Sequence, residues 1–112
     1  MEEEIDYSGF RKVDVRVGTI IDVQDFPEAR KKSFKLQIDF GGELGIKRSS
    51  AQIAHLYKKE LLVGRQVLCV VNFPRKQIAN FFSECLTLGV DGCGGVVLIL
   101  PERKVENGKR LY

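Results

Sequence analysis

The segment KVDVRVGTIIDV, residues 12–23, shows a long alternation of apolar and polar residues, which is typical of a half-buried β-strand. The apolar residues predicted to share its inner face are Val13, Val15, Val17, Ile21 and Val23. The polar residues predicted to share its outer face are Lys12, Asp14, Arg16 and Asp22. Gly18 interrupts the polar face, as happens where a strand bends or another backbone comes close.

Further strands are predicted on the C-terminal side of this segment. SFKLQIDF (33–40) alternates again, Gly41-Gly42 indicates a hairpin turn, and GIKRSSAQI (45–53) reads as the returning strand. AHLYKKELLVG (54–64) suits a short helix or loop. The nearly continuous apolar run QVLCVVNF (66–73) predicts a strand buried on both faces. FSECLTLGV (82–90) and VVLILP (96–101) predict a fifth strand and a short sixth one.

This order favours an all-β fold, a five-stranded OB-fold Greek-key barrel with a short helix between strands 3 and 4. The length of 112 residues fits a single domain, 1–112, with an N-terminal arm (1–9) and a C-terminal extension (101–112). Other small β-barrels and sandwiches remain open on the strand pattern alone.

Composition narrows the class of protein and its compartment. The three cysteines are an odd number without a C-x-x-C motif, which favours a reducing cytoplasm over a disulfide framework. The acidic N-terminus is unlike a secretory signal, and no apolar run reaches the length of about 20 residues needed to span a membrane. We therefore expect a soluble cytoplasmic protein that makes no membrane contact. The net charge of +3 is too small to predict nucleic-acid binding by itself.

The distribution of the cations is more informative. In an OB-fold, ligands usually meet the face of strands 2 and 3 and the loops joining strands 1–2 and 4–5. These loops are predicted at QDFPEARKK (24–32) and NFPRKQIANF (72–81). The cations expected on the surface that they form are Arg30, Lys31, Lys32, Lys35, Lys47, Arg48, Arg75 and Lys76. Cations neutralise phosphates and aromatic rings stack on unpaired bases, so this surface is a candidate RNA-binding site. Alternatively, Phe73, Phe81 and Phe82 only cap the core and the cations are solvated loop charges.

Four blocks together resemble the family of tRNA-binding domains that includes free-standing, CsaA-like members. They are KVDVRVGTI, FPEARK with SFKLQIDFG, GIKRSSAQI, and VVNFPRKQIANFFSECLTLG. The resemblance covers residues 10–109, and other members are domains appended to methionyl- and phenylalanyl-tRNA synthetases. It implies an OB-fold homodimer without catalytic activity that binds tRNA or structured RNA. Transferred by position, the nucleic-acid contacts fall near Lys35, Lys47, Arg48, Ser49, Asn72, Arg75, Lys76, Ser83 and Glu84.

The resemblance also implies a second function, because CsaA-like members are described as export-related chaperones for unfolded or precursor polypeptides. The rings expected to grip such a peptide are Phe26, Phe73, Phe81 and Phe82. The chain departs from the synthetase-type S-x-G-M motif at Ser83-Glu84-Cys85-Leu86, and it has Asn80 where CsaA-like relatives typically have glycine.

The sequence gives little evidence for a catalytic site or a cofactor-binding site. His55 is the only histidine, and nothing in the spacing of Ser49 or Ser50 indicates a catalytic triad. One histidine with three scattered cysteines does not make a zinc site, so we expect no metal and no cofactor. Apolar residues in the polar termini are candidates for packing across a dimer axis: Ile5, Tyr7, Phe10, Leu111 and Tyr112.

Overall fold

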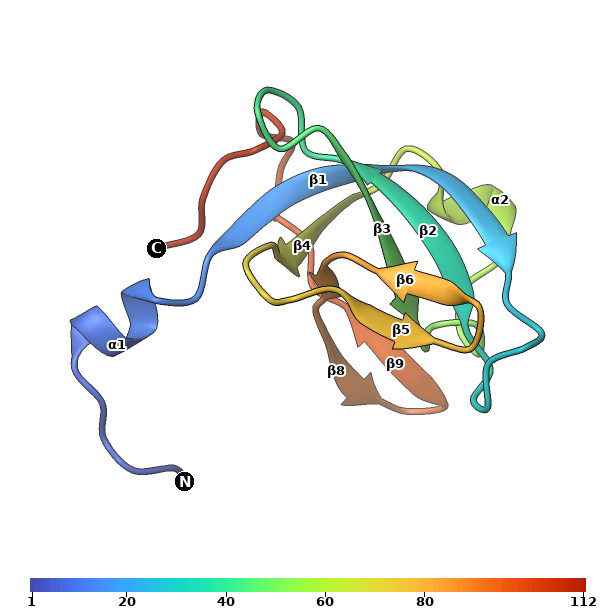
Figure 1. Cartoon of the computed structure of the whole chain (residues 1–112), viewed down its shortest axis with the longest axis horizontal. Helices are drawn as coiled ribbons and strands as arrows, with labels where there is room; N and C mark the ends of the chain where they lie inside the picture. The colour runs from blue at the N-terminus through green and yellow to red at the C-terminus, as the bar shows by residue number, and fades with distance from the viewer.

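The computed structural model describes all 112 residues, and its main element is a curved antiparallel sheet (Figure 1). The sheet has five strands in the order β3-β2-β1-β4-β7. Their bounds are β1 Val15–Asp25, β2 Phe34–Asp39, β3 Ile46–Ala51, β4 Gln66–Val70 and β7 Leu86–Thr87. The short helix α2 (Lys59–Leu62) lies between β3 and β4 in the chain, as predicted.

The barrel is nearly closed between β3 and the segment that leads into β7. The Glu84 N–H donates to the Arg48 carbonyl oxygen at 2.7 Å, and the Glu84 carboxylate accepts from the Arg48 N–H at 3.0 Å. Where these two segments meet, the Glu84 carboxylate therefore accepts a hydrogen bond that a backbone carbonyl would accept in a regular sheet. The predicted OB-fold with five barrel strands is confirmed.

The apolar residues form two clusters rather than one. The main cluster of 12 buried residues fills the barrel and includes Ile20, Leu36, Ile38, Phe40 and Val67. A second cluster of Val15, Val17, Leu68 and Val70 lies on the other face of β1 and β4. β4 contributes to both clusters, which confirms that it is buried on both faces.

The predicted inner face of β1 is wrong in its register. The pairing of β1 with β2 shifts between Ile20 and Asp22, which is a β-bulge. Before the bulge, Gly18 and Ile20 face the barrel core and Val15 and Val17 face the second cluster; Ile21 is exposed, and after the bulge Val23 packs against the core. The bulge changes which residues face inward, so strict alternation along 12–23 does not hold.

The predicted bounds of the fifth strand, 82–90, are also wrong, because only β7 within this stretch joins the five-stranded sheet and the rest belongs to other short strands. Residues 72–81, predicted as a loop, instead contain most of a hairpin of β5 (Lys76–Ile78) and β6 (Phe81–Ser83). β7 follows, and a second hairpin pairs β8 (Gly89–Gly92) with β9 (Gly95–Leu98). In the β5–β6 turn the left-handed backbone falls on Ala79 (φ 52°) rather than on Asn80.

The two termini run beside the start of β1. Helix α1 (Tyr7–Arg11) begins after Asp6, whose carboxylate accepts from the Gly9 N–H at 3.1 Å. The last residues extend the sheet locally, since the Leu111 N–H donates to the Val15 carbonyl oxygen at 2.9 Å. None of the helices combines the length and apolar character that crossing a membrane would require.

Asp14 ties the C-terminal segment to β1. Its Oδ1 atom lies 2.6 Å from Arg16 Nε and 3.4 Å from Arg110 Nε. The hydrogen bond from Arg16 holds the pKa of Asp14 below its usual value, against the opposing effect of burial. Arg110 also donates to the Arg11 carbonyl oxygen at 2.7 Å, so one charged cluster joins both ends of the chain.

Candidate nucleic-acid interface

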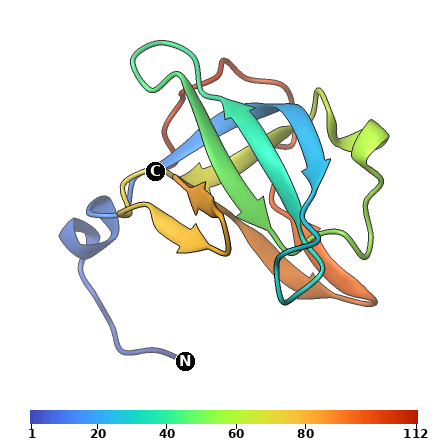
Figure 2. The ribbon, with the colours of Figure 1, turned by 45° about the vertical axis from the view of Figure 1, so that its right-hand side comes forward.

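The loop between β1 and β2 meets the β5–β6 hairpin, although the two segments are far apart in the sequence (Figure 2). The rings of Phe26 and Phe81 join them edge to face, with centroids 5.5 Å apart. Phe26 is only 3% exposed and anchors its loop. The two segments expected to form a ligand surface are therefore packed directly against one another.

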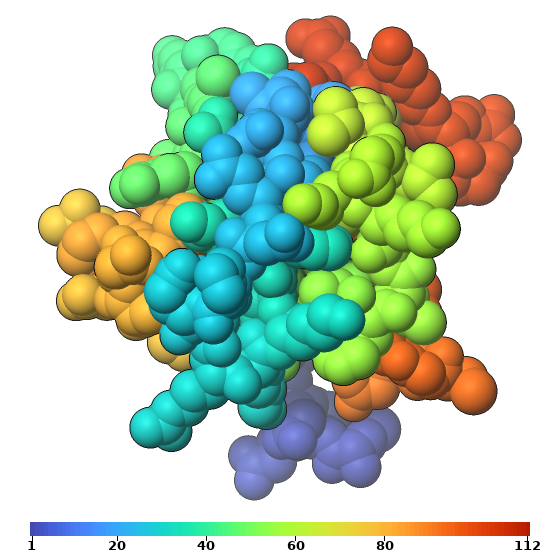
Figure 3. Space-filling view, turned by 90° about the vertical axis from the view of Figure 1, so that its right-hand side faces the viewer, coloured from blue at the N-terminus to red at the C-terminus, as the bar shows by residue number.

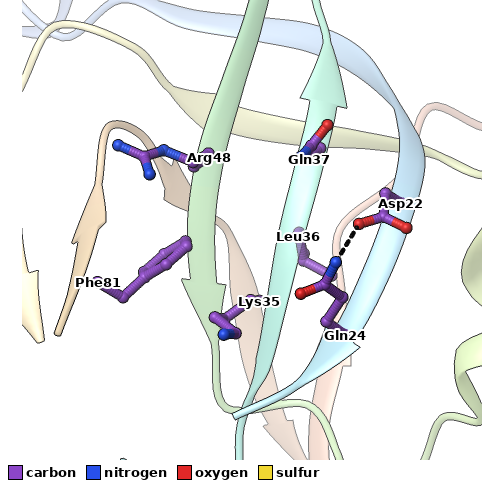
Figure 4. A pocket seen from close by; sticks show the side chains of 7 residues that line it. All are labelled: Asp22, Gln24, Lys35, Leu36, Gln37, Arg48 and Phe81. Carbon is purple, nitrogen blue, oxygen red and sulfur yellow. Dashed lines mark hydrogen bonds between the residues drawn. The ribbon is translucent and has the colours of Figure 1, made fainter. Parts of the chain in front are cut away.

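A hollow of about 230 Å³ lies on the outer face of β1, β2 and β3, beside this contact. Figure 4 shows Phe81 and Arg48 on one side of it and Asp22 and Gln24 on the other. Lys35 Nζ lies 5.5 Å from the Phe26 centroid and 6.0 Å from the Phe81 centroid, and Arg48 Cζ lies 5.5 Å from the Phe81 centroid. The partly exposed Phe81 ring thus has two cations close to it, and a ring beside cations is a combination suited to stacking a base next to phosphates. We call this the strand hollow.

A second hollow, of about 530 Å³, lies between the β1–β2 loop and the β5–β6 hairpin. Arg30 and Lys31 line it from the loop, and Lys76 and Gln77 line it from the hairpin. Arg75 precedes Lys76 in the chain but does not line this hollow, and its guanidinium lies 4.4 Å from the Phe82 centroid. Cations from both predicted loops therefore converge here, in what we call the hairpin hollow.

Four predicted contact residues have internal roles that occupy their side chains. Ser49 is 0% exposed and donates to the Cys85 carbonyl oxygen, and its hydroxyl also bonds Thr87. The Asn72 side chain accepts from the Asp14 N–H and donates to the Lys12 carbonyl oxygen.

Ser83 and Glu84 are the other two. The Ser83 hydroxyl accepts from the Ser50 N–H and donates to the Cys85 carbonyl oxygen. The hydrogen bond from the Arg48 N–H lowers the pKa of Glu84, and the Arg48 guanidinium lowers it further. Glu84 is therefore a carboxylate that closes the barrel, and it places a negative charge beside Arg48.

Two other predicted residues, Lys47 and Phe26, are placed differently from the expectation. Lys47 alternates with Arg48 along β3 and so points to the opposite face of the sheet. The Phe26 ring is buried beneath Lys35, which corrects the expectation that this ring is exposed to a peptide. Phe73, by contrast, is 51% exposed.

Sequence reasoning missed the polar side chains of the strand hollow, namely Asp22, Gln24 and Gln37. Gln24 donates to Asp22 at 3.2 Å, and both follow the bulge of β1. The alternation in SFKLQIDF did place Gln37 on the same face as Lys35, which was a usable signal. Asp22 and Gln24 required the strand pairing, because they lie opposite Gln37 and Lys35 only in the shifted register. No group of three histidine, cysteine, aspartate or glutamate side chains is placed to hold a metal ion.

The barrel and this surface define an OB-fold domain with a basic, aromatic-edged outer face. A family model described as "Putative tRNA binding domain" matches residues 15–110, so the chain belongs to the tRNA-binding-domain family. It is a CsaA-like member: a solved CsaA chaperone from Picrophilus torridus is 49% identical, with a TM-score of 0.92 over 97% of this chain and 100% of that chain. A CsaA chaperone from Bacillus anthracis is 44% identical, with a TM-score of 0.90 over 98% of this chain and 100% of that chain.

The chain is also similar to a part of larger proteins. The methionine–tRNA ligase of Thermococcus onnurineus is 32% identical over 109 residues, which is 97% of this chain and 14% of the ligase. The chain therefore spans only about one seventh of the length of this ligase.

Proposed function

We propose that the protein binds tRNA or another structured RNA without catalysing a reaction on it. The observation that carries this proposal is the contact between Phe26 and Phe81, which brings the β1–β2 loop and the β5–β6 hairpin together. The strand hollow and the hairpin hollow on either side of this contact form what we call the RNA face. Membership of the tRNA-binding-domain family supports the choice of RNA as the ligand.

Side chains of different chemistry are expected to contact different parts of the RNA. Arg30, Lys31, Arg75 and Lys76 are exposed and make no ion pair, so they are free to neutralise phosphates. Phe81 offers a ring for stacking on an unpaired base, worth roughly 1–3 kcal/mol per base. The Gln24 and Gln37 amides can donate to and accept from base edges or ribose hydroxyls. We place this activity in the cytoplasm, where the three free cysteines stay reduced.

The first test is filter binding of the unmodified protein to unfractionated tRNA across a series of salt concentrations. We expect log K to fall linearly with log salt, with a slope of about −3 to −5, because several lysine and arginine side chains release counterions. An affinity that does not change with salt, or no retention of tRNA at low salt, would contradict the proposal.

A second candidate function is the binding of unfolded or precursor polypeptides, as expected of an export-related chaperone. The similarity to proteins named CsaA chaperones favours it, as does the exposed ring of Phe73. If this function is correct, a peptide array retains the protein at high salt, and Phe81→Ser weakens the retention because the ring supplies apolar contact area. If the unmodified protein gives no signal above background at any peptide of the array, this function is ruled out.

We also propose that the protein acts as a homodimer. Ile5, Tyr7, Leu111 and Tyr112 are exposed large apolar side chains, with Tyr112 91% exposed. They belong to the two terminal segments, which lie beside the same end of β1, and a self-complementary apolar patch is what a two-fold interface requires. Light scattering at micromolar concentration should give about twice the mass of 12.7 kDa. A monomer mass would contradict the dimer.

A further inference from the structure

A third hollow lies on the other side of the β1–β2 loop from the hairpin hollow. Its volume is about 420 Å³, and residues from three separate segments line it. Lys31 and Lys32 come from the β1–β2 loop, Gln52 and His55 from the segment after β3, and Asp91 from the β8–β9 hairpin. We call it the distal hollow.

The distal hollow is continuous with the RNA face. Lys31 and Gln52 line both the distal hollow and the hairpin hollow, so the two share a wall. Figure 3 shows the intervening loop in teal, with the β5–β6 hairpin in orange-yellow on one side and the segment leading to α2 in yellow-green on the other. An RNA strand that leaves the hairpin hollow across this loop therefore enters the distal hollow.

The charges and donors in the distal hollow suit an anion. Lys31 and Lys32 are exposed and have no carboxylate within ion-pair distance. The Gln52 amide and the His55 ring each carry an N–H donor, in either tautomer of the imidazole. Asp91 is the only carboxylate that lines the hollow, and its negative charge disfavours binding of an anion.

Two contacts hold the walls in place. The Ser33 hydroxyl donates to the Lys31 carbonyl oxygen at 2.8 Å and fixes the end of the loop. Gly95 lies so close to the segment after β3 that a Cβ atom at this position would be 3.0 Å from both His55 Cβ and Leu56 Cγ. The β8–β9 hairpin is thus packed directly against the segment that carries His55.

We propose that the distal hollow is an additional phosphate-binding subsite of the RNA face. In it, Lys31, Lys32 and His55 hold a backbone phosphate of the same RNA molecule that occupies the hairpin hollow. This subsite deepens the proposed function and rests on it. It assigns a binding role to His55 and makes the β8–β9 hairpin a wall of the RNA path.

The position of the RNA can be tested from Cys93, which lies at the turn of the β8–β9 hairpin. Cys93 is exposed, whereas Cys69 and Cys85 are buried, so a thiol-reactive photo-crosslinker labels Cys93 selectively. After illumination, we expect a covalent adduct with bound tRNA that excess unlabelled tRNA abolishes. As a matched control, the same label on Arg103→Cys in a Cys93→Ser background should give little adduct, because Arg103 lines a different part of the surface.

The contribution of each side chain can be tested by filter binding. We expect Lys32→Gln to weaken tRNA binding about two- to fivefold and to reduce the salt slope by about one. His55→Ala should also weaken binding, His55→Gln should restore part of the loss through its amide donor, and Asp91→Asn should strengthen binding about twofold. Lys104→Gln, which removes the same charge elsewhere, serves as the control.

The outcomes of these experiments distinguish a failure of the subsite proposal from a failure of the RNA-binding proposal. If the unmodified protein binds tRNA but Cys93 gives no adduct and the Lys32, His55 and Asp91 variants bind like the Lys104 control, the subsite is wrong and the RNA proposal stands. If the unmodified protein does not bind tRNA at all, both proposals fail. Adduct formation together with the expected order of affinities supports the subsite.

Discussion

Reversing both charges at the start of β5, by Arg75→Glu with Lys76→Glu, is expected to weaken tRNA binding about 30- to 100-fold at low salt. Both side chains are exposed, and Lys76 faces Arg30 and Lys31 across the hairpin hollow. The double variant removes two phosphate contacts and places two carboxylates where phosphates are expected to lie. Filter binding across salt concentrations should therefore show both a weaker affinity and a slope reduced by about two.

The chain offers a closely matched control for this variant. Arg103 and Lys104 are also an adjacent arginine and lysine, both exposed, and Arg103→Glu with Lys104→Glu changes the net charge equally, from +3 to −1. A loss that depends only on net charge would be equal in the two variants. Equal losses, or an unchanged affinity for the hairpin variant, would remove the RNA face from the proposed function. The hairpin variant should keep its fold, because the lost contact between Arg75 and Phe82 is worth about 0.5–1 kcal/mol at an exposed site.

Gly18→Ala is expected to destabilise the fold by about 2–3 kcal/mol, which is a large part of the stability of a small domain. A Cβ atom at Gly18 would lie 2.6 Å from Ile38 Cγ2 and 2.8 Å from Phe40 Cδ1. Ile38 and Phe40 are 0% exposed, so neither side chain can move toward solvent to make room. Thermal unfolding followed by circular dichroism should show a fall in Tm of about 10–15 °C.

Gly9→Ala is the control for this substitution. A Cβ atom at Gly9 would meet its nearest neighbour, Ile5 Cδ1, at the ordinary distance of 3.5 Å. Because Gly9 lies in helix α1, alanine should leave the stability unchanged or raise it by up to about 1 kcal/mol. Similar Tm values for Gly18→Ala and the unmodified protein would mean that the core around Phe40 is loosely packed.

Much of the barrel could be predicted because its strands are long and have a buried face. β2, β3, β4 and the position of α2 follow directly from apolar periodicity and the glycine turn after Phe40. The region after Val70 could not be predicted in the same way, because its strands are only two to four residues long. Over so few residues, periodicity carries little information, and pairing with distant segments decides where each strand begins.

The candidate site likewise contains residues that could be predicted from the sequence and residues whose roles could not. The cations at Arg30, Lys31, Arg75 and Lys76 were found from composition, because exposed loop charges need no precise geometry. The roles of Ser49, Asn72 and Glu84 were not found, because their partners are 36 to 60 residues away in the sequence. A polar residue next to a basic cluster looks the same in the sequence whether it faces a ligand or satisfies a buried backbone group.

The amino-acid sequence by itself determined the long strands, the apolar residues of β2 and β4 and the two basic segments, because these depend on the chemistry of neighbouring residues. Only the tertiary structure decided which of the aromatic rings is exposed, where β1 changes register and which polar groups are already paired. The packing of Phe26 on Phe81 is the decisive case. It joins two segments that share no local pattern, and it exists only because the nearly closed sheet brings them within reach of each other.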